Sequence, residues 1–205
     1  MQKKMDLRRE FKHLYGPSSK QFVVVDVPPM QYLMIDGHGD PNAAMEYREA
    51  LETLYPVAYK LKFLSKAELQ KDYVVMPLEG LWWAADMTAF ASREKSLWDW
   101  TMMVMQPEWI TQAMLETVIE QLEGEPPPAI SGIRLEEYDE GLAVQIMHVG
   151  SYDDEGPTLQ KLHEEYIPQN GLEATGKHHE IYLNDPRRVA PEKLRTVLRQ
   201  PVRTR

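Results

Sequence analysis

The chain repeats one order of segments, and this repeat limits the folds available to it more than any other feature. A β-rich strand, a glycine-containing acidic loop, a helix and two further strands follow one another over residues 30–87 and again over residues 142–200. The two copies share this pattern and not their residue identities. We therefore predict an α+β fold in which a β-α-β-β unit is duplicated about a pseudo-two-fold axis. The expected sheet is antiparallel and concave, with the helices on its convex face and a groove for a ligand on the other.

Hydrophobic periodicity places the individual elements. Two-residue alternation and β-branched residues predict strands, whereas apolar residues three and four positions apart predict helices. Helices are expected to begin near Met45, Thr111 and Pro157, and Pro56 is expected to kink or split the first of them, because proline removes a helical hydrogen bond. The predicted strands are residues 22–27, 30–36, 72–76, 81–87, 98–104, 133–138, 141–149, 178–183 and 195–200.

Proline marks the expected boundary between the two copies. Three consecutive prolines at 126–128 are the best connector, which divides a single domain over residues 21–205 into halves at about 21–125 and 129–205. Residues 1–20 come before the first strand and are rich in charge. We expect them to form a solvated N-terminal tail.

Composition excludes several classes of protein. The 205 residues are 43% hydrophobic and 27% charged, which is ordinary for a globular chain. Without cysteine the chain has no disulfide, no thiolate nucleophile and no Cys-ligated metal. It also lacks a run of about 18 apolar residues and an apolar N-terminal stretch, so we predict neither a membrane span nor a classical signal peptide. These features favour a cytoplasmic protein.

Charge is distributed unevenly along the chain. The net charge is −9, but residues 1–20 hold six basic and two acidic side chains, and residues 186–205 hold seven basic and one acidic. Residues 21–185 therefore carry a net charge of −19. Such a body repels a phosphate backbone, so nucleic acid is not an expected partner. The basic ends either contact an acidic partner or lie along the acidic body, and the oligomeric state stays open.

All five tryptophans lie between residues 82 and 109. Aromatic rings bury large flat surfaces, so such a cluster either packs a core or forms the walls of a pocket for a flat ligand. Met102, Met103 and Met105 lie in the same strand, and methionine suits both uses. The tryptophans are Trp82, Trp83, Trp98, Trp100 and Trp109.

The predicted strand 178–183 carries the most informative polar residues. If Ile181 and Leu183 pack under the helices, alternation sends His178, Glu180 and Tyr182 to the opposite face. On a solvated face Glu180 is an ordinary surface carboxylate. In a groove it could pair with a cationic ligand or act as a base on a bound water.

Other motifs carry less chemistry. His178 and His179 are adjacent in a strand and point to opposite faces, so we predict no metal site. The metalloprotease, P-loop, hydrolase-elbow and dinucleotide-binding signatures are absent, and no cofactor is expected. His38, in the loop after the second strand, is expected to be structural or solvated rather than catalytic.

Three segments together resemble the GyrI-like small-molecule-binding family in its stand-alone bacterial form. They run from Tyr32 to Asn42, from Pro77 to Trp83 and from Gly176 to Arg188. The match extends from about residue 20 to the end. The resemblance implies a duplicated α+β unit with a concave antiparallel sheet, in agreement with the repeat.

The resemblance also implies a function. Members of the family include drug-sensing domains in which a strand carboxylate meets planar cationic or aromatic compounds, and Glu180 matches that position. Some stand-alone members are similar to hydrolases that open the strained cyclopropane of cyclopropanoid cyclohexadienone genotoxins. On this basis Glu180 and Tyr182 are the candidate catalytic residues. The candidate ligand-contacting residues are Trp82, Trp98, Trp100, Met102 and His38.

Two other functions remain open at the level of sequence. The chain could bind or sequester a planar aromatic or cationic molecule without turning it over, with Glu180 as a counter-charge only. It could instead inhibit a DNA-handling protein through surface contacts.

Overall fold

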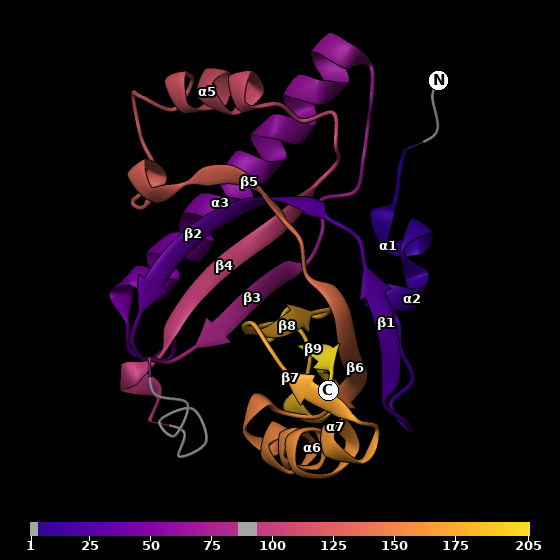
Figure 1. The fold of residues 1–205 in the computed structure, drawn as a ribbon. Coiled ribbons are helices and arrows are strands. Elements are labelled where there is room, and N and C mark those ends of the chain that lie inside the picture. The colour runs from indigo at the N-terminus through magenta and orange to yellow at the C-terminus, as the bar shows by residue number, and fades with distance from the viewer. Residues whose placement is uncertain (1–3, 86–93) are drawn as a thin grey trace. The chain divides into compact units, whose positions relative to one another are not determined.

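The chain folds into two compact units, each with antiparallel strands and its own helices, in a computed structural model that describes residues 4–85 and 94–205 (Figure 1). Unit 1 consists of Met1–Glu10, Met30–Met76 and Gly80–Tyr138. Unit 2 consists of Phe11–Pro29, Pro77–Glu79 and Asp139–Arg205. The main crossing from unit 1 to unit 2 therefore lies between Tyr138 and Asp139, twelve residues later along the chain than the start of the proline connector at 126–128.

Unit 1 contains a sheet with strand order β3-β4-β2-β5. Strands β2 and β4 pair antiparallel with Leu33 opposite Val104, and β5 pairs with the other side of β2. The long helix α3 packs against β2 and β4. The elements of this unit are α1 (Leu7–Glu10), β2 (Met30–His38), α3 (Met45–Leu64), η1 (Ser65–Leu69), β3 (Leu78–Trp83, whose first two residues belong to unit 2), η2 (Lys95–Leu97), β4 (Asp99–Gln106), α5 (Gln112–Glu120), η3 (Ile130–Gly132) and β5 (Arg134–Tyr138).

Unit 2 contains a sheet with strand order β1-β6-β9-β8, and β7 pairs with β9 outside this path. Leu198 of β9 lies opposite Ile146 of β6 and opposite Glu180 of β8. The elements of this unit are α2 (Lys12–Tyr15), β1 (Val23–Val27), β6 (Gly141–Val149), η4 (Tyr152–Glu155), α6 (Gly156–Gln160), η5 (Lys161–Tyr166), α7 (Ile167–Gln169), β7 (Leu172–Ala174), β8 (His178–Tyr182), η6 (Pro191–Lys193) and β9 (Arg195–Thr204).

The two units repeat the same connectivity, which confirms the predicted α+β duplication, but the unit 1 copy runs from β2 to β4 instead of ending at residue 87, because residues 72–76 contribute no strand. In unit 1 the first strand of the repeat, β2, pairs with the last, β4, and β4 borders β3. In unit 2 the first strand, β6, pairs with the last, β9, and β9 pairs with β8. One further strand lies beside the first strand in each case, β5 in unit 1 and β1 in unit 2.

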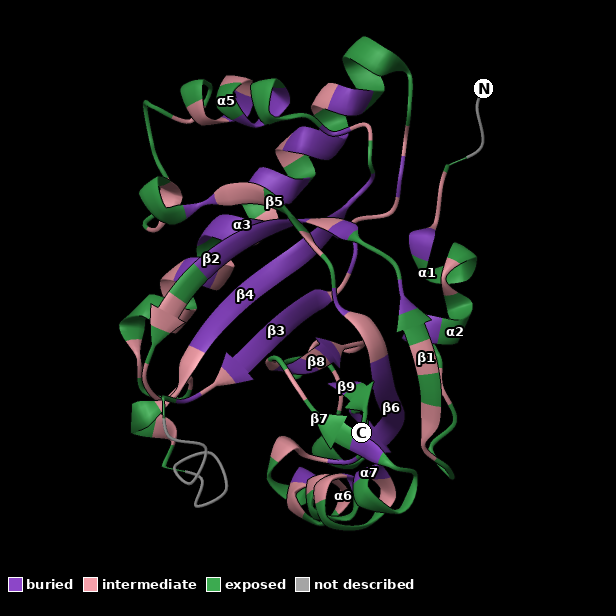
Figure 2. Ribbon diagram, viewed as in Figure 1, coloured by how far each residue is buried: buried purple, intermediate pink, exposed green. Residues whose placement is uncertain are grey.

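Burial on helix α3 explains why Pro56 is tolerated. The helix runs without interruption from Met45 to Leu64, so the expectation that Pro56 splits it is wrong. Leu54, Val57 and Leu61 follow helical spacing and have no exposed surface. Each such side chain contributes roughly 1.5–3 kcal/mol on burial, and together they outweigh the ~3 kcal/mol cost of an interior proline. Figure 2 shows this buried stripe of α3 and the buried strands β3 and β4.

Some sequence-based strand assignments differ from the structure. Residues 72–76 form no strand, and Tyr73 makes one isolated bridge to Met5. Tyr73 is nevertheless fully buried, and its hydroxyl donates to Gln106 Oε1 at 3.0 Å. The alternating pattern of residues 72–76 therefore indicates burial and not pairing in a sheet. Strand β7 was not predicted, and the part of the predicted strand 81–87 that covers residues 86 and 87 lies outside the described residues.

The described part of the N-terminal segment is anchored by a few buried side chains, although most of its other residues are exposed. Leu14 and Tyr15 of α2 are 0% and 4% exposed, and Leu7 of α1 is also buried. Within unit 2, the backbone carbonyls of His13 and Leu14 accept hydrogen bonds from the side chains of Gln145 and Arg199. Three apolar residues among the charges were enough to dock this segment. No helix among the described residues is both long and apolar enough to span a membrane.

Candidate functional site

The carboxylate of Glu180 and the hydroxyl of Tyr182 form a hydrogen-bonded pair on β8. Tyr182 donates to Glu180 Oε2 at 2.7 Å, because residues two apart in a strand share a face. Both residues are half-buried, and the side chain of Glu180 is 14% exposed. The ring of Tyr152, from η4, meets the Tyr182 ring edge-on at 5.6 Å. A carboxylate therefore lies among aromatic groups with little surface in water.

The structure places this pair on the helix-facing side of the unit 2 sheet, which corrects the sequence-based assignment. Glu180 lies opposite Leu198, and in the same register Gln200 lies opposite Val144, so these side chains share one face. Val144 packs in a core cluster with Leu162 of η5 and Ile167 of α7. The expectation from sequence, with Ile181 under the helices and Glu180 on the other face, is therefore wrong.

The error has a physical cause. Ile181 is fully buried, as its apolar side chain requires. Its face of the sheet is the face of Arg199, which bonds to the backbone of α2. The cover on that face is α2, which belongs to a charged segment that the sequence predicts to be a solvated tail.

Two histidines lie beside the pair. His178 has a side chain only 1% exposed, and its Nε2 is 3.6 Å from Glu180 Oε1. His163, on η5, is half-buried, and its pKa is lowered to about 4 by burial and by the nearby His178. His163 is therefore neutral at pH 7. Neither His163 nor Tyr152 was singled out from the sequence, because nothing in the local pattern links the helical segment to β8.

The opposite face of β8 carries a buried network of charge. His179 has no exposed surface, and its two ring nitrogens face Glu140 and Glu79. Arg199 donates to Glu140 Oε2 at 2.9 Å and to Gln145 Oε1 at 3.0 Å. The carboxyl of Glu140 is buried, which alone raises its pKa, but the charges of His179 and Arg199 and their hydrogen bonds lower the pKa to about 2. The carboxylate is therefore ionised across the physiological range.

In unit 1 the structure brings three of the five tryptophans together. The rings of Trp82 and Trp98 meet edge-on at 5.8 Å. Tyr47 of helix α3 lies 6.2 Å from Trp82 and 5.4 Å from Trp100. Trp82 and Trp100 are buried, at 4% and 0% exposed, whereas Trp98 is half-buried. The cluster is thus built on the face that meets α3, and Trp98 is its more exposed member.

Two glycines make room for this cluster. A Cβ on Gly37 would lie 2.1 Å from Trp100 Cη2, because the Trp100 ring covers the backbone of the residue opposite it in β2. A Cβ on Gly80 would lie 2.8 Å from Trp82 Nε1 and 3.3 Å from Met102 Sδ. Met102 therefore packs with the tryptophans, and it has no exposed surface.

The remaining candidates lie elsewhere in unit 1. His38 is exposed, and its Nδ1 is 2.9 Å from Asp99 Oδ1 at the edge of the β2–β4 pair. Trp109 is separate from the cluster: its indole donates to Ser65 Oγ, and its ring meets Tyr73 and the ammonium of Lys71.

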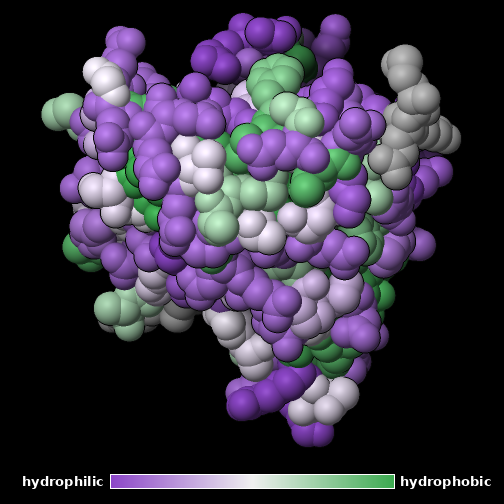
Figure 3. Space-filling view, turned by 90° about the horizontal axis from the view of Figure 1, so that it is seen from above, coloured by the Kyte–Doolittle hydropathy of each residue, from purple (hydrophilic) through white to green (hydrophobic). Residues whose placement is uncertain are grey.

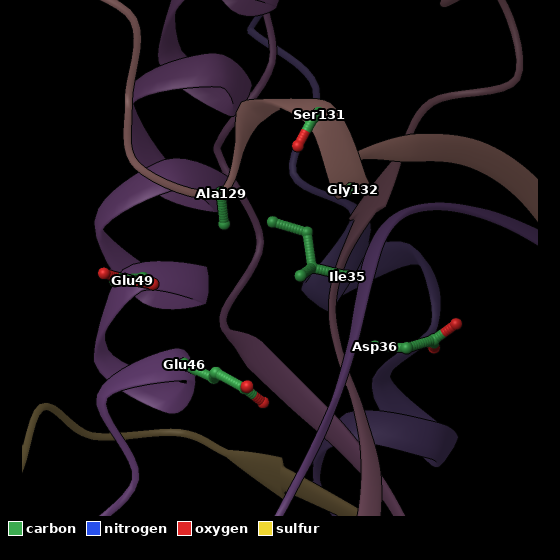
Figure 4. A pocket seen from close by; sticks show the side chains of 7 residues that line it. All are labelled: Ile35, Asp36, Glu46, Glu49, Ala129, Ser131 and Gly132. Carbon is green, nitrogen blue, oxygen red and sulfur yellow. The ribbon is translucent and has the colours of Figure 1, made fainter.

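A cavity of about 160 Å³ in unit 1 contains none of the predicted site residues (Figure 4). Glu46 and Glu49 of α3 line one side, and Ile35 and Asp36 of β2 the other. Asp36 is already held by Thr101 at 2.6 Å and by Arg134 at 3.0 Å. In the part of the chain that the structure describes, no group of three or more His, Asp or Glu side chains is arranged to hold a metal ion.

Comparisons with known proteins identify the family. The sequence model of the GyrI-like small-molecule-binding domain matches residues 20–203. The chain belongs to this family. Among curated proteins, no relative matches it.

Solved structures agree with the family assignment. The GyrI-like chain is 39% identical to an uncharacterized conserved protein from Listeria innocua, with a TM-score of 0.89 over 98% of this chain and 100% of that one. It is 37% identical to a hydrolase from Listeria innocua, with a TM-score of 0.86 over the same shares of the two chains. The C-terminal domain of EcmrR, at 12% identity and a TM-score of 0.57 over 90% of this chain and 98% of that one, shares the fold alone.

The predicted site residues thus form two groups. Glu180 and Tyr182 are together in unit 2, with Tyr152 and His178 beside them. Trp82, Trp98, Trp100 and Met102 are together in unit 1, with Tyr47. His38 touches Asp99 and joins neither group by any contact described above.

Proposed function

We propose that this GyrI-like protein binds planar hydrophobic molecules and hydrolyses cyclopropanoid electrophiles, which would remove DNA-alkylating compounds from the cytoplasm. The observation that carries this proposal is the Glu180–Tyr182 pair, a carboxylate 14% exposed with a phenol donating to it at 2.7 Å. The pair joins a proton acceptor to a donor that can support developing negative charge. The similarity to a hydrolase from Listeria innocua, 37% identical over nearly the whole chain, supports the same reaction class.

The proposed reaction has two coupled events. Glu180 takes a proton from a water molecule, and the water oxygen bonds to a carbon of the cyclopropane ring. The strained carbon–carbon bond breaks, its electron pair passes into the dienone, and the carbonyl oxygen becomes a phenolate that takes up a proton. Tyr182 turns its O–H from Glu180 to that oxygen, where the negative charge accumulates. Within unit 1, the half-buried ring of Trp98 would contact a flat molecule, while Trp82, Trp100 and Met102 are buried and support the cluster.

The substitution Glu180→Gln tests the mechanism. Glutamine has the same shape and still accepts a hydrogen bond from Tyr182, but it cannot take a proton from water. We expect the rate of cyclopropane opening to fall by about 100-fold or more, while the melting temperature changes little. The matched control is Glu173→Gln on β7, an exposed carboxylate paired with Arg203, which should change neither quantity.

The same measurements separate the competing functions. Wild-type turnover that survives Glu180→Gln removes Glu180 from the mechanism. A protein that binds planar aromatics through Glu180 but turns over no cyclopropane is a binding or sequestering module, in which Glu180 acts as counter-charge. A protein partner retained equally by wild type and Glu180→Gln, without ligand turnover, favours an inhibitor that works through its surface.

A further inference from the structure

The buried network behind β8 is built around a histidine that the proposed reaction does not use. His179 Nε2 lies 3.0 Å from Glu79 Oε2, and His179 Nδ1 lies 3.0 Å from Glu140 Oε1. Tyr15 donates to the second oxygen of Glu79 at 2.7 Å, and Arg199 donates to Glu140 at 2.9 Å. All these groups belong to unit 2, and the side chains of His179, Glu79 and Glu140 have no exposed surface.

Geometry sets the protonation of His179. An imidazole ring donates from both nitrogens only when it is protonated, and here both nitrogens face carboxylate oxygens. Burial alone lowers the pKa of His179, but the charge of Glu140 and the hydrogen bonds with Glu140 and Glu79 raise it overall. Two basic side chains, His179 and Arg199, thus face two acidic side chains, Glu79 and Glu140. Tyr15 and Gln145 complete the network as uncharged partners.

The network holds β8 on one side only. Adjacent residues of a strand point to opposite faces, so a side chain fixed on one face sets the backbone from which its neighbour projects. His179 pairs with Arg199 across the β8–β9 ladder, and Glu180 is the next residue. Carboxylates from two other segments hold the ring, Glu79 from the start of β3 and Glu140 from just before β6.

We propose that His179 is the positioning residue for the Glu180–Tyr182 pair: clamped between Glu79 and Glu140, it fixes the part of β8 from which Glu180 projects. The expected effect of His179 on turnover rests on the proposed function. Its expected effect on the Glu180–Tyr182 hydrogen bond does not, and that effect can be tested without measuring turnover. It also gives the N-terminal segment a role, since Tyr15 completes the clamp at Glu79.

The test uses a single and a double variant. His179→Gln leaves the buried network with one uncompensated negative charge, so we expect a large fall in melting temperature. Glu79→Gln/His179→Leu again pairs one acidic side chain, Glu140, with one basic side chain, Arg199, and we expect it to recover part of that loss. Leucine has no hydrogen-bonding group in its side chain, so it can bond to neither of its neighbours in the network. The double variant therefore restores charge balance without restoring the clamp.

Two readouts then separate positioning from stability. In a crystal structure of the double variant, we expect that Tyr182 no longer donates a hydrogen bond to Glu180. If the wild-type protein opens the cyclopropane, we also expect the kcat of the double variant to fall by up to about 100-fold while its KM stays nearly unchanged. Tyr73→Phe is the control, because it removes a buried hydrogen bond of unit 1, from the Tyr73 hydroxyl to Gln106. It should leave the Glu180–Tyr182 hydrogen bond and kcat as they are in the wild-type protein.

The measured kcat and the Glu180–Tyr182 hydrogen bond of the double variant decide whether His179 has a positioning role. A double variant whose kcat recovers together with its melting temperature, or whose Glu180–Tyr182 hydrogen bond is unchanged, overturns the positioning role. If the wild type opens no cyclopropane, the proposed function has failed, and the hydrogen bond in the variant structure alone decides whether His179 positions Glu180.

Discussion

At the scale of single residues, the packing around each tryptophan ring decides whether that ring is free to contact a ligand. Trp100 lies over the backbone of Gly37, where any Cβ would overlap its ring. Such a ring is locked in place and fully buried, so Trp100 supports the cluster more than it adapts to a ligand. Trp98 is half-buried and touches Trp82 edge-on. It is therefore the tryptophan of the cluster best suited to exchange contacts with a flat molecule.

We expect Trp98→Ala to weaken binding of a planar aromatic cation such as ethidium by about 10-fold, since one aromatic contact contributes roughly 0.5–1.5 kcal/mol beyond its buried area. Quenching of the remaining tryptophans measures the dissociation constant. The matched control is Trp109→Ala, because the contacts described for Trp109 are with Ser65, Tyr73 and Lys71. Equal losses of affinity from the two substitutions would contradict this use of the cluster.

At the scale of elements, strand β8 is enclosed on both faces, and each face has a different chemistry. The α2 side holds the charged network around His179, which is saturated with hydrogen bonds. The helical side holds Glu180 and His178, with His163 above them on η5. One strand thus separates a buried network of paired side chains from the half-buried carboxylate of Glu180 and its neighbours.

His163 predicts a pH dependence of stability. Its pKa is about 4 in the folded chain against an ordinary 6.5, so between these values the unfolded chain binds the proton and the folded chain does not. The free energy of unfolding should therefore fall as the pH is lowered from 6.5 to about 4. Chemical denaturation of wild type and His163→Gln over this range measures the effect. The variant should lose less stability over the range; parallel curves for the two proteins would show that His163 does not titrate as described.

At the scale of the whole molecule, the charged ends of the chain belong to the folded units. Arg199, in the basic C-terminal stretch, is 1% exposed and bonds to Glu140. Leu14, in the basic N-terminal stretch, has no exposed surface. Other basic residues of the ends pair with acidic neighbours in their own unit, as Arg203 does with Glu173. The face seen from above is mostly hydrophilic, with hydrophobic side chains in small groups among the charges (Figure 3).

Removal of residues 1–20 should therefore destabilise the protein strongly. Loss of a buried leucine alone costs about 2–5 kcal/mol, and the deletion also removes Tyr15 from Glu79 and the Leu14 carbonyl from Arg199. We expect the urea midpoint of the truncated chain to fall sharply or folding to be lost. Arg9→Ala, which removes a side chain 86% exposed, should leave the midpoint nearly unchanged. A truncated chain with the wild-type midpoint would show that this segment is a dispensable tail.

Much of the fold was predictable because its signals are local. The duplicated order of segments and the N-cap at Thr111, whose side chain accepts from the Met114 amide, follow from neighbours in sequence. The strands on either side of Asp139 were also predictable, but they form no hairpin with each other, because β5 pairs with β2 and β6 pairs with β1 and β9. The spacing of Glu180 and Tyr182 likewise put them on one face of a strand. Tyr73 shows the limit of such signals, because its alternating neighbourhood reports burial and contains no partner strand.

The sequence by itself determined the elements, their duplication and which residues of β8 share a face, since strand period and turn chemistry act over a few residues. Only the tertiary structure decided which face of β8 meets η5 and which meets α2. It also decided that His179 is clamped by Glu79 and Glu140, residues 100 and 39 positions away in the chain. The alternation of side chains along a strand shows which residues share a face, but it does not show which element packs against each face. What packs on each face decides this. Here one face of β8 is covered by a short charged segment, which is held in place because Leu14 and Tyr15 are buried and Tyr15 bonds to a residue far along the chain.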